Sequence, residues 1–310
     1  MQPLVSVIIP TFNCESYIAE TINSVLNQDY PSIELIIIDD GSTDKTRHII
    51  SDYKDKLKLI TQNNSGVCVA RNRGIKEAAG QFICLMDHDD YWFPDKISRQ
   101  VAEFMAHPEI GIVYSSFTLW KSNSDGTFAS PDTFGNQLVN DEIDNYYSGW
   151  IYHLLLLDSW VLTSTAMIRA EVFDECGDFD ENLPYSEDWD LWLRVARKYP
   201  FLKLHRSTTL YRQHPGQGNR KIRPIDYRTN LLINAKKKWG LCSPNGNCLT
   251  NWQFRKQLAK YHFEFGLHHL IANDHKIAIR SFLKAWFTFP VNLKYLAYIP
   301  ISSLGWRPSY

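Results

Sequence analysis

Short runs of β-branched and other apolar residues alternate with segments of helical periodicity along the first hundred residues. Runs of this kind are typical of strands that are buried on both faces of a parallel sheet. Four such runs lie at Val5–Ile9, Ile33–Ile38, Leu57–Ile60 and Phe82–Met86. Apolar residues recur at helical spacing in the segments between them, 17–26, 46–53 and 69–79. The alternation predicts right-handed βαβ units and a doubly wound, mostly parallel α/β sheet.

The pattern becomes less regular after this point. It still predicts a helix over 94–107 and a strand over 110–117. From Lys121 to Ser148, Ser, Asn, Asp and Gly dominate, which predicts a surface loop that is long enough to act as a lid. Beyond the loop, regular elements are expected at 161–169, 189–198 and 201–213.

The last hundred residues are predicted to be helical and rich in Trp, Phe, Tyr and Lys. The expected helices lie at 220–238, 252–271 and 275–287. We therefore expect an α/β domain over 1–215, with the lid at about 121–148, and a helical C-terminal region over 216–310.

Composition is that of a folded globular protein, with 44% hydrophobic and 22% charged residues. The net charge of −1 does not indicate a nucleic-acid partner. The charge is nevertheless unevenly divided. Residues 1–214 carry 18 Lys and Arg against 31 Asp and Glu, a net −13, whereas residues 215–310 carry 15 against 3, a net +12. An acidic body thus precedes a basic tail.

The six cysteines show neither CxxC nor Cys/His ligand spacing. We therefore expect a reducing compartment, with no disulfide framework and no structural zinc. No basic n-region or small-residue cleavage site precedes the first apolar run. No apolar run reaches the roughly 18 residues of a membrane-spanning helix. A cytoplasmic protein is the expectation.

Candidate chemistry follows the predicted strands, because ligands bind at the carboxyl ends of strands in open parallel sheets. The first strand leads into Pro10–Asn13, which supplies a hydroxyl, an aromatic face and an amide, and the second leads into Asp39–Ser42. The fourth leads into Asp87–Asp90, with three carboxylates in four positions. A helix cap needs only one carboxylate, and like charges oppose joint ionisation unless a cation is bound. Hard oxygen ligands suit Mg²⁺ or Mn²⁺.

Further polar groups are predicted near the same edge. Glu187 and Asp188 open a helix, where they either compensate the helix dipole or supply a base. Arg212 and His214 end the last strand, where they either bind phosphate or cap the acidic body, and Arg71 adds a cation. This set suits a nucleotide-diphosphate ligand. Hydride transfer is not indicated, because no GxGxxG follows the first strand.

Five motifs in this order strongly resemble those of a family 2 glycosyltransferase of the GT-A fold, over about residues 4–215. The motifs are Val5–Asn13, Ile38–Asp44, Ala70–Gly74, Met86–Asp90 with Pro94, and Glu187–Trp192. The resemblance implies an inverting, metal-dependent enzyme that uses a nucleotide-diphosphate sugar, with UDP the family's most frequent nucleotide and Mn²⁺ or Mg²⁺ as cofactor. It also implies a role in bacterial surface polysaccharide or glycan assembly.

The resemblance also implies roles for individual residues at the donor site. Asp40 is expected to accept a hydrogen bond from the base, and Arg71 to lie near the nucleotide. Asp87 and His88 are expected beside the ribose or sugar, with no catalytic role for His88. The other donor-site residues implied are Pro10, Thr11, Phe12, Asn13, Gly41 and Ser42.

Catalytic and metal-binding roles follow from the same resemblance. Asp188 matches the base that deprotonates the acceptor hydroxyl, and Glu187 helps to hold it or the acceptor. Asp87 and Asp89 match the two acids of the DxD motif, with Asp89 the more direct metal ligand. His214 is expected to contact the metal or the diphosphate. Inversion needs a single displacement, so one base is sufficient and no protein nucleophile is required.

Cations and aromatics are interleaved in the tail, which leaves two arrangements open. The tail either binds an anionic membrane surface or packs on the acidic body, and it could support a homodimer. The resemblance implies a glycan or a lipid-linked acceptor, and a lipid-linked acceptor agrees with the first arrangement, a peripheral attachment to the membrane. Two other functions remain: a catalytically inactive nucleotide-sugar-binding or scaffolding subunit, and a nucleotidyltransferase. The latter expects a Gly-rich, basic first loop, which Pro10–Glu15 lacks.

Overall fold

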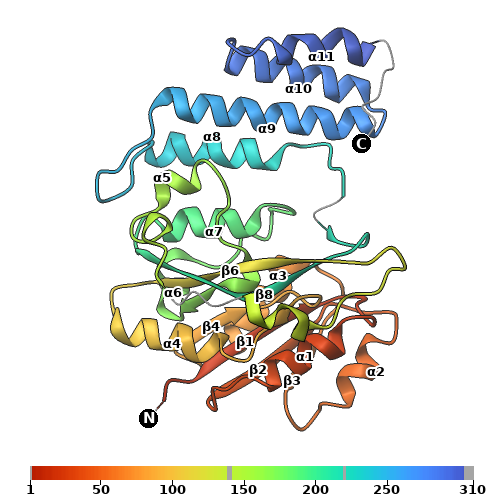
Figure 1. Cartoon of the computed structure of the whole chain (residues 1–310), viewed down its shortest axis with the longest axis vertical. Helices are drawn as coiled ribbons and strands as arrows, with labels where there is room; N and C mark the ends of the chain where they lie inside the picture. The colour runs from red at the N-terminus through yellow and green to blue at the C-terminus, as the bar shows by residue number, and fades with distance from the viewer. Residues whose placement is uncertain (1, 138–141, 219–220, 304–310) are drawn as a thin grey trace. The chain divides into compact units, whose positions relative to one another are not determined.

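A computed structural model describes residues 2–137, 142–218 and 221–303 of the chain (Figure 1). The chain divides into two units, one formed by residues 1–151 with 160–215 and the other by residues 152–159 with 216–310. The segment 152–159 therefore joins the second unit, although the sequence pattern alone assigns it to the first.

The first unit is built on one sheet with the order β3-β2-β1-β4-β7-β6-β8-β5. Its strands are β1 Val5–Thr11, β2 Ile33–Asp39, β3 Lys58–Thr61, β4 Phe82–Leu85, β5 Tyr91–Trp92, β6 Ile112–Lys121, β7 Met167–Arg169 and β8 Phe201–Gln213. Strands β3, β2, β1 and β4 are mutually parallel, and β6 is parallel to β8. Strands β7 and β5 pair antiparallel to their neighbours. The predicted mixed, mostly parallel α/β sheet is confirmed.

Helices cover both faces of this sheet (Figure 1). They are α1 Ile18–Leu26, α2 Thr46–Ser51, α3 Val67–Glu77, α4 Lys96–Ala106, α6 Glu171–Cys176 and α7 Glu187–Val195. The apolar faces of α1 and α4 share a buried cluster with Val5, Val7 and Ile9 of β1. Ile8 points to the opposite face of the sheet and packs against Gly74 of α3. A Cβ at position 74 would lie only 2.3 Å from Ile8 Cγ2, so glycine permits this close contact. The alternation along β1 thus sets which helix covers which face.

The segment expected to form the lid is partly regular. Strand β6 continues through Lys121, short 3-10 helices form at Pro131–Gln137 and Asn145–Tyr147, and Ile143 bridges to Leu204 of β8. Residues 138–141 of this segment lie outside the described residues.

Lys96 at the start of α4 is fully buried. Its Nζ donates a hydrogen bond to Gln100 Oε1 at 2.7 Å and lies 4.0 Å from the centroid of the Trp92 ring. Burial opposes the charged ammonium and lowers the pKa of Lys96 to about 8. The lysine therefore costs stability wherever the unfolded chain keeps it protonated.

Replacing this lysine by methionine is expected to remove a pH-dependent part of the stability. As the pH rises from 7 to 10, the folded state releases the Lys96 proton before the unfolded state does. The free energy of unfolding of the wild type should therefore increase by about 2.5 kcal/mol more over this range than that of Lys96→Met. Denaturant unfolding of both proteins at the two pH values measures this difference. Equal changes in the two proteins would show that Lys96 titrates normally.

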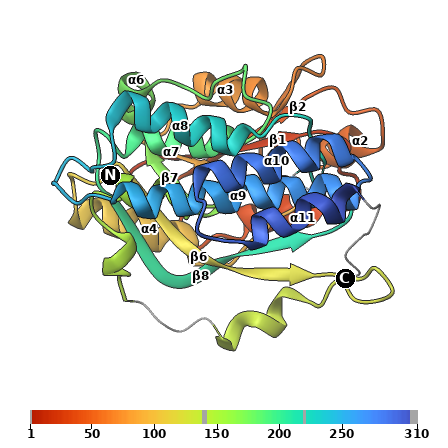
Figure 2. The same ribbon diagram turned by 90° about the horizontal axis from the view of Figure 1, so that it is seen from above.

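The second unit is helical, as predicted, and its helices α9, α10 and α11 lie side by side (Figure 2). Its helices are α5 Tyr152–Leu155, α8 Tyr227–Trp239, α9 Asn251–Ile271, α10 His275–Thr288 and α11 Lys294–Ser303. Helix α9 begins with a capping box formed by Thr250 and Gln253. A Cβ on Gly266 would lie 2.6 Å from the Phe282 ring, so glycine permits the close packing of α9 on α10. Helices α5 and α11 were not predicted.

Cys242 and Cys248 form a disulfide, so the prediction that no cysteines pair is wrong for these two. They close a turn in which Ser243 N donates to Asn247 O at 2.8 Å, and the two cysteines pair as an isolated antiparallel bridge. Spacing alone did not reveal this turn.

The described part of the chain contains no helix that is long and apolar enough to cross a membrane.

Candidate active site

The carboxyl ends of β1 and β2 are joined by hydrogen bonds between the loops that follow them. Asn13 N donates to Ser42 Oγ at 3.0 Å, and Thr43 N donates to Asn13 Oδ1 at 2.8 Å. Gly41 has a φ of +81°, and a Cβ there would lie 2.8 Å from Asn64 N, so only glycine fits this turn. Phe12 remains 41% exposed, which leaves its ring accessible for stacking.

Asp40 is buried and already accepts three hydrogen bonds from the loop before α3. Its Oδ1 accepts from Gln62 Nε2 and from Ser65 N, both at 2.8 Å, and its Oδ2 accepts from Gly66 N at 2.8 Å. A carboxylate offers about four acceptor positions, so little capacity is left for a further donor. Asp40 therefore orders this loop, and its expected contact with a base stays a prediction.

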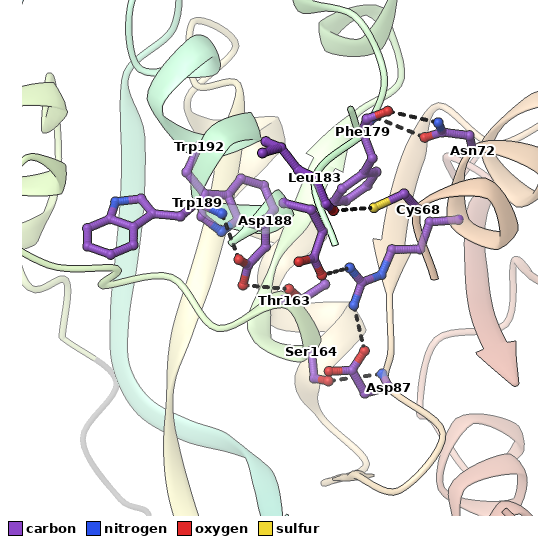
Figure 3. A network of polar contacts seen from close by, with 12 residues as sticks. Cys68, Asn72, Asp87, Thr163, Ser164, Phe179, Leu183, Asp188, Trp189 and Trp192 are labelled. Carbon is purple, nitrogen blue, oxygen red and sulfur yellow. Dashed lines mark hydrogen bonds and ion pairs between the residues drawn. The ribbon is translucent and has the colours of Figure 1, made fainter. Parts of the chain in front are cut away.

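A buried arginine joins two of the motifs. Arg71 on α3 donates through one terminal nitrogen to Glu187 Oε1 and through the other to Asp87 Oδ1, both at 2.8 Å (Figure 3). Burial disfavours its charge, but the two carboxylates outweigh burial and raise the pKa of Arg71. The guanidinium also lies 5.1 Å from the Phe179 ring. Both terminal nitrogens of Arg71 are thus engaged with carboxylates, whereas its buried Nε has no hydrogen-bond partner among the residues that the structure describes.

Helix α3 also fixes the loop that leads into α7 (Figure 3). The Asn72 side chain donates to Phe179 O and accepts from Phe179 N, both at 2.9 Å. Cys68 Sγ donates to Leu183 O at 3.4 Å. The loop ends at Ser186 with a φ of +63°, a left-handed conformation that is uncommon for serine. These contacts hold the start of α7 beside α3.

Asp188 lies in the first turn of α7. Its Oδ1 accepts from Trp189 N at 2.7 Å, and its Oδ2 accepts from Thr163 Oγ1 at 3.3 Å (Figure 3). Burial and the neighbouring Glu187 raise the pKa of Asp188 to about 7, although Arg71 opposes the shift. A carboxyl that titrates near neutrality suits a general base.

The acidic loop after β4 turns one carboxylate toward the end of β8. Asp89 Oδ2 lies 2.9 Å from His214 Nε2. Burial alone would raise the pKa of Asp89, but hydrogen bonding to His214 and the two nearby histidines lower it. His88 Nδ1 lies 3.2 Å from Pro10 O, and Asp87 N donates to Ser164 Oγ at 3.1 Å. The Asp89 and His214 side chains are therefore adjacent, although 125 positions separate them.

Arg212 also belongs to this site, and the sequence left open whether it binds phosphate or caps the acidic body. It is buried, its Nε donates to Asp89 O at 2.6 Å, and it also pairs with Glu20. Its guanidinium lies 3.8 Å from the centroid of the Trp120 ring. These contacts support the acidic loop, so of the two earlier alternatives the structure favours charge compensation of the body over phosphate binding.

The site as a whole lies in the first unit, at the edge where β1, β2 and β4 end. It brings together the Asp89–His214 pair and the network of Arg71, Asp87 and Glu187, with Asp188 beside Glu187. Within residues 2–137, 142–218 and 221–303, no three His, Cys, Asp or Glu side chains form a group able to hold a metal ion. Thr163, Ser164 and Phe179 also belong to the site, and no sequence pattern had indicated them.

Comparisons with known proteins agree with this architecture. Residues 6–152 match the model of Glycosyl transferase family 2. The chain is 34% identical over 238 residues to UDP-Glc:alpha-D-GlcNAc-diphosphoundecaprenol beta-1,3-glucosyltransferase WfaP of Escherichia coli, which covers 74% of the chain and 85% of that protein. It is 35% identical to an uncharacterized glycosyltransferase of Rickettsia typhi, over 63% of the chain and 59% of that relative, so it spans about three fifths of that relative's length.

Solved structures show the same fold. The chain superposes on S. aureus TarS 1-349 in complex with UDP-GlcNAc with a TM-score of 0.64 and 21% identity, over 97% of this chain and 87% of that one. The mannosyltransferase PcManGT from Pyrobaculum calidifontis, in complex with GDP-Man and Mn²⁺, gives a TM-score of 0.59 at 17% identity, over 98% and 85% of the two chains. At these identities the likeness concerns the fold.

Proposed function

The chain belongs to glycosyltransferase family 2, and on that premise we propose that it transfers a sugar from a UDP-sugar to an acceptor hydroxyl with inversion at the anomeric carbon. The acceptor is a glycan or a lipid-linked saccharide in bacterial surface polysaccharide assembly. Two relatives support this assignment by their names: the UDP-Glc-dependent WfaP, and a putative teichuronic acid biosynthesis glycosyltransferase TuaG of Bacillus subtilis, 39% identical over 130 residues.

The observation that carries the proposal is the contact network between Asp87, Arg71 and Glu187. Arg71 binds both carboxylates at 2.8 Å and so joins the acidic loop after β4 to the first turn of α7. An inverting transfer needs the donor and the base held in fixed relation, because attack occurs opposite the leaving group. A buried ion-pair bridge between the two motifs supplies that rigidity.

Asp188 is the proposed base. With its pKa raised to about 7, it is partly deprotonated at neutral pH and basic enough to accept the proton of an attacking hydroxyl. Thr163 Oγ1 donates to Asp188 Oδ2 and orients the carboxylate. Glu187 is held by Arg71, and its negative charge beside Asp188 raises the pKa of Asp188, which makes that carboxylate a stronger base.

Asp89 and His214 are the proposed protein ligands of a divalent cation. The carboxylate oxygen of Asp89 is a ligand that suits Mn²⁺ or Mg²⁺, and the imidazole nitrogen of His214 lies 2.9 Å from it. Asp87 is the third candidate ligand, with its Oδ1 bound to Arg71. A bound cation would stabilise the negative charge that develops on the leaving diphosphate. The donor's own oxygens would complete the coordination.

The donor nucleotide is proposed to lie against Pro10–Asn13 and Asp40–Ser42. The exposed Phe12 offers a ring for the base, and the hydrogen bonds between Asn13, Ser42 and Thr43 fix the two loops relative to each other. Thr11 is buried in β1 and contributes to the floor of this region. The nucleotide therefore meets a preformed surface, which lowers the entropic cost of binding.

A thermal-shift panel tests the donor class. Among UDP, GDP, dTDP and CDP, we expect UDP with Mn²⁺ to raise the melting temperature by about 3–5 °C at saturating concentration, because a ligand of the folded state alone stabilises it. In Asp89→Ala the gain that depends on Mn²⁺ should disappear. A larger shift with another nucleotide would mean that the donor carries that nucleotide and not UDP. No shift with any of the four would favour a catalytically inactive scaffolding subunit.

A further inference from the structure

One end of the helical unit exposes a group of large apolar side chains. Phe287 and Val291 are each 73% exposed and Leu293 is 71% exposed, and all three lie in or beside the turn between α10 and α11. Trp252, at the start of α9, is 58% exposed and lies 5.6 Å from the Phe289 ring of the same turn. We call Trp252, Phe287, Val291 and Leu293 the turn patch.

The turn patch is anchored to a folded core and is not a frayed end. Arg255 Nε donates to Thr288 O at 2.8 Å and so ties the start of α9 to the end of α10. Phe282, Phe289 and Tyr295 are buried in the cluster below. The chain thus buries some aromatic residues of this turn and leaves their neighbours exposed. Such a patch on a protein surface marks an interaction site.

Basic residues surround the patch. Lys256, Lys284 and Lys294 are exposed, and Lys256 Nζ lies 5.1 Å from the Trp252 ring. Lys276, Arg280 and Lys284 follow one another at four-residue spacing along α10 and are all exposed. No Asp or Glu occurs in residues 251–263 or 275–303. The segments that carry the exposed apolar side chains thus have basic residues and no acidic ones, and the next acidic residue along α9, Glu264, pairs with Arg228 and Lys260.

We propose that the turn patch docks this unit on an anionic lipid surface. Phe287, Val291 and Leu293 would enter the boundary between headgroups and acyl chains, while the lysines and Arg255 stay at the level of the anionic headgroups. Apolar insertion and charge attraction add, and a surface of this kind needs both. A second copy of the chain fits less well, because a two-fold contact through the patch would bring like charges together. The proposal is independent of donor, acceptor and turnover.

Co-sedimentation with vesicles tests the lipid proposal without any substrate. The full chain is expected to bind vesicles of phosphatidylcholine and phosphatidylglycerol in equal amounts about tenfold or more tightly than vesicles of phosphatidylcholine alone. Added salt should weaken the binding. The double variant Phe287→Ser with Leu293→Ser should lose about tenfold in affinity.

A matched control is available on the same unit. Ile271 is 40% exposed at the far end of α9, about 28 Å from Trp252 along the helix, so Ile271→Ser should bind as the wild type does. Circular dichroism should show all these variants folded. Equal binding by the double variant and the wild type, or no binding to anionic vesicles, would overturn the proposal. A dimer in sedimentation equilibrium that the double variant dissociates would instead assign the patch to a second copy.

Discussion

Asp188→Asn is expected to lower kcat by about 10³-fold while leaving donor affinity within about threefold of the wild type. The amide keeps the size of the side chain and its hydrogen bond with Thr163, but it cannot accept the proton of the attacking hydroxyl. Nucleotide release from the UDP-sugar selected by the thermal-shift panel measures turnover, and calorimetry with UDP and Mn²⁺ measures binding.

The pH dependence gives an independent test of the same base. Because the pKa of Asp188 is raised to about 7, the rate of the wild type should increase with pH as this carboxyl loses its proton. Asp190 is the matched control, since it lies in the same turn of α7 and pairs with Arg194 at 2.8 Å. Asp190→Asn should keep both the rate and the pH profile. If Asp188→Asn retained activity within about threefold, another group would be the base.

Elements with a strong internal pattern could be predicted from the sequence. Strands β1, β2 and β4 are continuous apolar runs, and their predicted bounds differ from those of the structure by one or two residues. Strand β8 spans Phe201–Gln213, the predicted range. Strands β1 and β4 are buried throughout and β2 is buried from Leu35 onward, so local sequence and tertiary environment agree on the same conformation in these strands.

Elements that depend on partners far along the chain could not be predicted. Strand β5 has only two residues, Tyr91 and Trp92, and exists because they pair with Leu210 and Thr209 of β8. Strand β7, Met167–Arg169, lies within the regular element expected at 161–169, but its short length and its antiparallel pairing with β4 and β6 were not predicted. Neither is long enough to carry a periodic signal.

The sequence predicted that the candidate site residues lie at one edge of the sheet, because most of them follow the ends of strands. It did not predict the contacts between their side chains. The family resemblance placed Arg71 near the nucleotide, which stays a prediction, but it did not indicate that this side chain is buried between Asp87 and Glu187. Asp40 was expected to accept a hydrogen bond from a base, and nothing in the sequence indicated that the loop at 62–66 supplies three donors to it. Such pairings depend on where side chains from α3 and α7 meet, and spacing along the chain does not specify this.

Arg71→Met tests whether this bridge joins the acidic loop to the base. The substitution leaves Asp87 and Glu187 without their shared cation, and losing one partner of a buried pair should lower the free energy of unfolding by about 3 kcal/mol. It also removes the charge that lowers the pKa of Asp188, so the midpoint of the pH–rate profile should move to higher pH by about one unit. At pH 7 the variant therefore loses rate beyond what its stability explains.

Arg73→Met separates this effect from a general loss of positive charge on α3. Arg73 lies two residues further along the same helix with an exposed side chain, so its removal changes the net charge equally but leaves the bridge intact. Stability measured by denaturant unfolding and the pH–rate profile should both stay at wild-type values in this control. If Arg71→Met reduced stability but left the midpoint unchanged, the arginine would serve the fold alone. A shifted midpoint in Arg71→Met and not in Arg73→Met would mean that the cation which holds Glu187 in place also tunes the proposed base.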